Sequence, residues 1–133
     1  MATFNLSFCD PLNPEVIDLG VHSKEETIRL FNNIKWDEYL DKMVDVSPDD
    51  IYYSPSFSAA NSDNNAIVSI SALESGLFYI MYFTPLVPRK IMGVEIGKKG
   101  GKLFDLNDAT PQDSLKAITY LVDGNIEALS KMF

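Results

Sequence analysis

A long central stretch with almost no charge is the feature that most constrains how this chain folds. Between Ile51 and Pro88 the only charged residues are Asp63 and Glu74, whereas charges are frequent on both sides of the stretch. It divides into three runs, IYYSPSFSA, AIVSISAL and LFYIMYF, separated by Asn/Ser/Asp and Glu-Ser-Gly turns. Runs rich in β-branched and aromatic residues between turn residues are typical of β-strands. The stretch therefore predicts the middle of an antiparallel sheet.

The two later runs also predict which side chains share a face of that sheet. Successive side chains of a strand point to opposite faces. In Leu77–Phe83 this alternation produces two apolar sets, because aromatic and aliphatic residues occupy both faces. In the run before it, Val68 and Ile70 fall opposite Ser69 and Ser71. One face therefore has the composition of an ordinary core, and the other is more polar.

The N-terminal part of the chain predicts two further strands and two helices. Thr3–Phe8 alternates strictly between apolar and polar residues, which predicts a half-buried strand, and Val16–Val21 is a short apolar segment that fits an edge strand. Ser23, followed three residues later by Glu26, predicts a helix start with a capping box. A second helix is expected to begin near Trp36, where apolar residues recur at helical spacing.

The C-terminal part predicts a hairpin and a long helix. The apolar runs KIMGVEI and KLFDL flank the glycine- and lysine-rich segment Gly97–Gly101, which predicts that they pair with each other. Thr110 and Pro111 predict a helix start, and Gly124 is expected to kink that helix or divide it in two. The whole order predicts an α+β fold in one domain, residues 1–133: a single layer of mostly antiparallel sheet, about five to six strands, with two to three helices packed on one face.

Composition and charge exclude several classes of function. The formal net charge is −8 and the isoelectric point is about 4.4, so the surface repels nucleic-acid backbones. The longest apolar run, Leu77–Phe83, is far shorter than a membrane-spanning helix. A basic segment followed by an apolar one is missing at the N-terminus, so no signal peptide is predicted and a cytoplasmic location is expected.

No motif for catalysis, a cofactor or a metal is found in the sequence. Cys9 is the only cysteine and His22 the only histidine, so thiolate clusters and paired-histidine metal sites are excluded. The segment Gly97–Lys102 fails the phosphate-loop pattern, because Ile96 and Leu103 stand where glycine and serine or threonine are required. We therefore predict no catalytic residue, no cofactor and no metal, although the absence of motifs leaves the question of enzymatic activity open.

Five aspartates occur in two small groups that could be mistaken for an ion site. Their spacing does not match a calcium-binding loop, and we interpret them as residues at helix ends, where aspartate caps the backbone. The two groups are Asp45, Asp49 and Asp50, and Asp105 and Asp108.

The more polar face of the predicted sheet is the best candidate for a working surface. Two or three helices in a chain of 133 residues cannot easily cover both faces of a sheet. Tyrosine and methionine are enriched at interface cores. We therefore predict a non-enzymatic interaction protein that binds itself as a homodimer or binds a protein partner, for example as an immunity or inhibitor protein. The candidate interface consists of Ser69, Ser71, Tyr79 and Met81.

Two alternatives remain open at this stage. The N-terminal segment or the last helix could cover the more polar face. The protein could also be a small-molecule-binding protein or an enzyme, with an aromatic pocket between sheet and helices formed by Trp36, Tyr39, Tyr52 and Tyr53, together with Tyr79. Trp36 and Tyr39 lie at helical spacing, which is more typical of a core than of a pocket.

Overall fold

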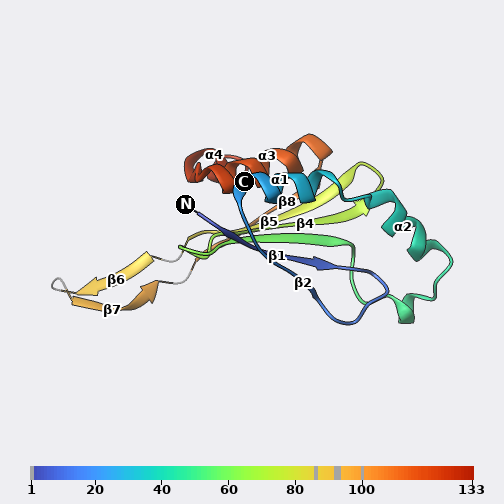
Figure 1. The fold of residues 1–133 in the computed structure, drawn as a ribbon, viewed down its shortest axis with the longest axis horizontal. Coiled ribbons are helices and arrows are strands. Elements are labelled where there is room, and N and C mark those ends of the chain that lie inside the picture. The colour runs from blue at the N-terminus through green and yellow to red at the C-terminus, as the bar shows by residue number, and fades with distance from the viewer. Residues whose placement is uncertain (1, 86, 92–93, 100) are drawn as a thin grey trace.

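Six segments of the chain pair into one antiparallel sheet in the computed structural model, which describes residues 2–85, 87–91, 94–99 and 101–133. The strand order is β2-β1-β3-β4-β5-β8, and every neighbouring pair is antiparallel. The fold is α+β, as the sequence predicts, with the sheet open at both edges (Figure 1). The six strands are β1 Phe4–Cys9, β2 Ile17–His22, β3 Ser56–Asn61, β4 Ile67–Glu74, β5 Leu77–Phe83 and β8 Leu103–Ala109.

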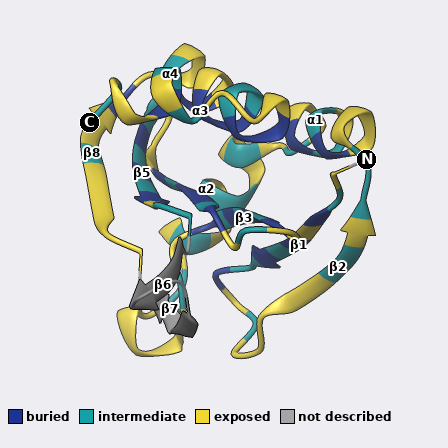
Figure 2. Cartoon of the chain, turned by 90° about the vertical axis from the view of Figure 1, so that its left-hand side faces the viewer, coloured by how far each residue is buried: buried dark blue, intermediate teal, exposed yellow. Residues whose placement is uncertain are grey.

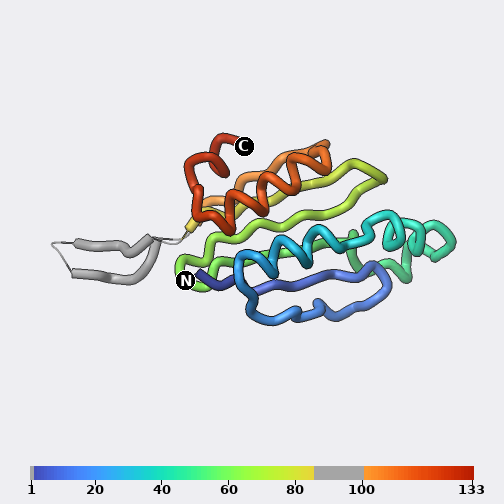
Figure 3. Tube along the Cα trace, turned by 45° about the horizontal axis from the view of Figure 1, so that its top comes forward, coloured from blue at the N-terminus to red at the C-terminus, as the bar shows by residue number. Residues whose placement is uncertain are grey.

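Helices cover one face of this sheet. Helices α1 (Lys24–Asn32) and α3 (Pro111–Asp123) contact each other and the central strands, and the tube view shows them running over the same side (Figure 3). Helix α2 (Trp36–Val44) contacts β4 and lies at one end of the sheet (Figure 1). A short 3-10 helix, Pro48–Asp50, follows α2, and α4 (Ile126–Ser130) contacts α3.

Local signals fix the helix ends. The Thr110 hydroxyl accepts a hydrogen bond from the Asp113 backbone N–H at 3.0 Å, and the Asp113 carboxylate accepts one from the Thr110 N–H at 3.0 Å. Gly124 has a φ of 71° and separates α3 from α4, so the predicted division is confirmed. At α1 the Ser23 hydroxyl accepts from the Glu26 N–H at 3.3 Å, which is one half of the predicted capping box.

The core lies between the helices and one face of the sheet. On β5 the side chains of Phe78, Ile80 and Tyr82 are buried, while those of Tyr79 and Met81 are only half-buried. The predicted assignment of faces on this strand is therefore confirmed. An aromatic cluster extends the core toward α2, with ring centroids 4.8–6.2 Å apart; its members are Phe8, Phe31, Trp36, Tyr39, Phe57 and Phe78.

The predicted hairpin between KIMGVEI and KLFDL is wrong. Strand β6 (Val87–Ile91) pairs with β7 (Val94–Lys99) in a separate two-stranded sheet, and β8 pairs with β5. In this register Leu106 lies opposite Ile80 and packs against the core. The Gly97–Lys102 segment includes position 100, which lies outside the described residues.

The opposite face of the sheet carries none of the α-helices in the described part of the chain. The view along the strands places α1, α3 and α4 together on one side of the sheet (Figure 2). The last helix, α4, packs on α3 in that layer, and the N-terminal segment enters the sheet as β1. We call the helix-free side of the sheet the open face.

Candidate functional site

The strand register places the side chains of the open face in rows across the sheet. Residues paired in antiparallel strands point to the same face, so each row can be followed from strand to strand. The central row runs from β2 to β8 through Asp18, Ser7, Ser58, Ser69, Met81 and Asp105. The next row contains Cys9, Ser56, Ser71 and Tyr79. The four predicted interface residues, Ser69, Ser71, Tyr79 and Met81, therefore lie together near the middle of the open face.

Serine hydroxyls on β3 and β4 satisfy one another. The Ser58 hydroxyl donates to the Ser69 hydroxyl at 2.9 Å, and the Ser56 and Ser71 hydroxyls are hydrogen-bonded at 2.8 Å. Such cross-strand pairs stabilise a sheet. They also give the hydroxyls hydrogen-bond partners that water would otherwise have to supply. The middle of the open face is therefore uncharged and internally hydrogen-bonded.

A tyrosine–aspartate pair lies beside the serine pairs. The Tyr79 hydroxyl donates to the Asp105 carboxylate at 2.6 Å, a charge-assisted hydrogen bond between β5 and β8. This hydrogen bond, with smaller contributions from desolvation and the aspartate charge, raises the pKa of Tyr79, so the phenol remains protonated. The interpretation of Asp105 as a helix-end residue is wrong: it lies within β8, and only the pairing of β8 with β5 brings it to Tyr79.

Apolar side chains border the serine pairs at one end of the open face. Apart from the exposed Asn5 on β1, which separates Val21 from the rest, this row is apolar: Ala60 and Ile67 lie in the interior strands, and Phe83 and Leu103 lie side by side on β5 and β8. Three of its residues are more than a third exposed, Val21 at 59%, Leu103 at 53% and Phe83 at 37%. Exposed apolar groups that lie side by side commonly mark interaction sites.

The residues of the alternative aromatic pocket are divided among different places. Trp36 packs edge-on against Phe78 with ring centroids 5.4 Å apart, on the helix side of the sheet. The Tyr53 hydroxyl donates to the Pro14 carbonyl at 2.9 Å, and Tyr52 is 54% exposed. Tyr79 lies on the open face, across the sheet from Trp36.

A groove does exist near α2. It has a volume of about 400 Å³ and lies between the α1–α2 region and strands β1 and β2. Tyr39 is its one residue from the predicted aromatic set. Its other lining residues are Phe8, Ile17, Leu19, Leu30, Asn33, Ile34, Lys35, Glu38 and Phe57.

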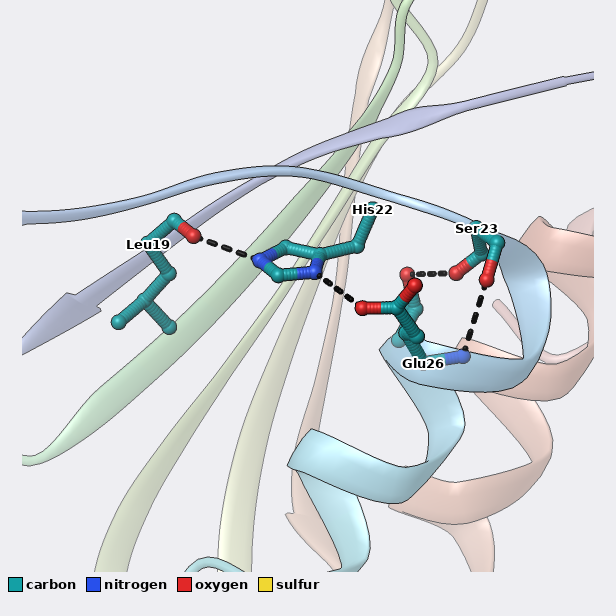
Figure 4. Close-up of polar contacts among 5 residues, drawn as sticks. Leu19, His22, Ser23 and Glu26 are labelled. Atoms are coloured by element: carbon teal, nitrogen blue, oxygen red, sulfur yellow. Dashed lines mark hydrogen bonds and ion pairs between the residues drawn. The ribbon is translucent and has the colours of Figure 1, made fainter.

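His22 joins the edge strand β2 to helix α1 (Figure 4). One ring nitrogen, Nδ1, lies 2.9 Å from the Glu26 carboxylate, and the other, Nε2, lies 2.6 Å from the Leu19 carbonyl oxygen. Both neighbours are acceptors, so the ring binds both best as the doubly protonated imidazolium. The hydrogen bond to Glu26 raises the pKa of His22 most, followed by the one to the Leu19 carbonyl. The His22–Glu26 hydrogen bond also lowers the pKa of Glu26.

These contacts do not assemble a catalytic or metal-binding arrangement. Neither ring nitrogen of His22 faces a hydroxyl or thiol, and burial raises the pKa of the Cys9 thiol, which opposes formation of a reactive thiolate. Among the described residues, no three His, Cys, Asp or Glu side chains lie close enough together to hold a metal ion.

Comparison with known proteins adds no relative. No protein-family model, no curated protein and no solved structure matches this chain. Within the described residues, no helix has both the length and the apolar character needed to cross a membrane.

Proposed function

We propose that this protein is a non-enzymatic interaction module that binds a protein through its open face. The observation that carries this proposal is the combination of three properties in one surface. The middle of the face is uncharged, its four serine hydroxyls on β3 and β4 are paired with one another, and no α-helix of the described chain lies over it. A partner can therefore cover this surface without leaving many polar groups unsatisfied.

The side chains of the open face fit an interface better than they fit a permanently hydrated surface. Tyr79 and Met81 are of the types that are enriched at interface cores. Leu103 and Phe83 add exposed apolar area at the adjacent edge. Six strands about 4.8 Å apart and about 20 Å long give a face of roughly 500 Å². A standard interface buries about 800 Å² on each partner, so this face together with the side chains around its rim is close to the size of a standard interface.

The partner on this face is either a second copy of the chain or a different protein. An immunity-type or inhibitor protein, which binds one target and blocks it, is a concrete version of the second case. Such a protein requires no catalytic residue of its own, and the acidic net charge of −8 would speed its association with a basic target.

The proposal is tested by placing a charge on the open face. Ser58→Arg and Met81→Arg each introduce a long cation there, while Gln112→Arg adds the same group to an exposed position on α3. Each variant is first compared with the wild type by circular dichroism and thermal unfolding. Oligomeric state is then measured by light scattering, and proteins retained from a lysate of the source organism are identified by mass spectrometry.

We expect either a dimer or a specific retained protein with the wild type and with Gln112→Arg, and its loss with both open-face variants. A monomeric wild type that retains the same proteins as both open-face variants contradicts the proposal.

A small-molecule-binding function is the second candidate, and the groove that contains Tyr39 is the observation that favours it. Its volume of about 400 Å³ falls within the usual range of ligand pockets, and its walls are largely apolar. A thermal-shift screen against metabolites tests this function: saturable stabilisation by one chemical class that is lost in Tyr39→Ala supports it, and no stabilisation by any class rejects it.

A further inference from the structure

The open face differs in side-chain size from one strand to the next. Three adjacent strands, β1, β3 and β4, carry small side chains over most of it, whereas β5 carries large ones. The small residues are Ser7, Cys9, Ser56, Ser58, Ala60, Ser69 and Ser71, and the large ones on β5 are Leu77, Tyr79, Met81 and Phe83. The small residues therefore form a band along the strands beside the larger side chains of β5, with Asn5 and Ile67 as larger residues at one end of it. We call this band of small residues the serine floor.

The width of the serine floor matches an α-helix. The floor lies between β5 on one side and β2 on the other, and consists of the three strands between them. Four inter-strand spacings of about 4.8 Å separate the two bordering strands by about 19 Å. A helix with its side chains is about 10–12 Å across, so one helix fits between the borders and can approach the serine floor closely.

The sheet is rich in acidic side chains and has no lysine or arginine. Four acidic residues occur within the six strands, Asp18, Glu74, Asp105 and Asp108, and the one histidine, His22 at the end of β2, is paired with Glu26. Asp18 and Asp105 occupy the two ends of the central row on the open face, about 24 Å apart by strand spacing. A helix lying along the serine floor would therefore have a carboxylate on each side. Each carboxylate would lie within reach of a lysine or arginine of that helix, or within a Debye length of it.

We propose that the occupant of the open face is a basic amphipathic helix of a protein partner, lying along the strands with small or apolar residues toward the serine floor and lysine or arginine along its flanks. This inference rests on the proposed interaction function and specifies the partner. Charge argues against a second copy, because face-to-face contact would bring together two surfaces that carry carboxylates and no lysine or arginine, in molecules of net charge −8.

The test uses a synthetic helix as a defined probe. The probe is a stapled peptide of about 16 residues, about 24 Å long, with alanine and leucine on one face and lysine along both flanks. A matched peptide carries glutamate in place of every lysine. Binding to the isotope-labelled protein is followed by NMR chemical-shift changes at low and at physiological salt. The expected changes lie at the amides of β1, β3, β4 and β5, with the lysine peptide only, and they weaken as salt is added.

Two pairs of charge-neutralising substitutions locate the electrostatic contribution. Asp18→Asn with Asp105→Asn removes the flanking carboxylates, and Glu25→Gln with Glu38→Gln removes the same charge from the helix layer. We expect the first pair to weaken binding of the lysine peptide about two- to tenfold, and the second pair to weaken it by much less.

Three outcomes overturn the inference: no shift with the lysine peptide, equal shifts with both peptides, or shifts confined to the helix layer. Its failure can be distinguished from failure of the proposed function. If a retained protein is lost on Ser58→Arg and Met81→Arg but binds through an extended or uncharged segment, the interaction function stands and the basic helix is rejected. A wild-type dimer that both open-face variants disrupt likewise rejects the basic helix in favour of a second copy.

Discussion

Tyr82 carries a buried hydroxyl that the fold leaves without a hydrogen bond, and its removal should stabilise the protein. The side chain is fully buried on the core face of β5, stacked against Phe104 and Phe133 at centroid distances of 6.5 and 5.7 Å. Its hydroxyl has no hydrogen-bond partner among the described residues. The same burial raises the pKa of Tyr82. The hydroxyl loses water on folding and gains no partner in return.

The expected magnitude follows from that desolvation. Leaving a buried polar group unsatisfied costs about 1–3 kcal/mol, and the small void left by removal of one oxygen offsets part of that gain. Tyr82→Phe keeps the ring and its stacking, so we predict an increase of about 1 kcal/mol in the free energy of unfolding. For a domain of this size this corresponds to roughly 4 °C in the melting temperature.

The assay is urea and thermal unfolding of Tyr82→Phe beside Tyr79→Phe, the same chemical change on the other face of β5. Tyr79→Phe loses the hydrogen bond to Asp105 and should be slightly less stable than the wild type. A loss of more than about 0.5 kcal/mol in Tyr82→Phe would refute the reasoning, because it would mean that the hydroxyl is bound, with the Ser130 side chain on α4 as the candidate partner.

Two further predictions concern the edge strand and the C-terminal helices. The raised pKa of His22 and the lowered pKa of Glu26 mean that their contact contributes fully to stability between about pH 4.5 and 6.5. This contribution is lost as the pH rises through the folded-state pKa of His22, and also as it falls through that of Glu26. An NMR titration of this single histidine should give a pKa above 6.5 in the wild type and a lower one in Glu26→Gln; equal values contradict the contact. Gly124→Ala should reduce the unfolding free energy by about 1 kcal/mol, because the added Cβ meets nothing within 4 Å and only the positive φ opposes it. Chemical denaturation with Gly124→Asn as the milder control checks this, and an unchanged midpoint in Gly124→Ala contradicts it.

Local patterns were enough to predict the helix starts and the faces of the central strands, but not every strand: the run predicted from Ile51 is strand only from Ser56, and KIMGVEI is divided between β6 and β7. The alternation in Leu77–Phe83 placed Phe78 and Ile80 on the core side and Tyr79 and Met81 on the other, because side-chain direction in a strand depends only on its period of two. The start of α3 was equally local, since Thr110 and Pro111 act within one helical turn. These features require no knowledge of what the segment meets in the fold.

Strand pairing could not be predicted in the same way. The segment around Leu103 was expected to pair with the run that precedes it, but it adds to the sheet beside β5. That choice depends on the apolar edge left by β5 and on the helices that cover the neighbouring core, which are distant in sequence. Asp105 was misinterpreted for the same reason, because its hydrogen bond to Tyr79 exists only after β8 joins the sheet. The small-residue floor of the open face likewise requires the order β1-β3-β4, which the sequence alone does not give.

The most direct test of the open face as the working surface is photo-crosslinking in cells of the source organism. A photoreactive amino acid replaces Ser71 on the open face in one strain and Gln112 on α3 in another. Illumination should join the chain to a discrete protein partner from position 71 and not from position 112, because only the first lies within the proposed contact. Adducts from position 112 alone, or from neither position, would contradict the assignment of the open face as the interaction surface.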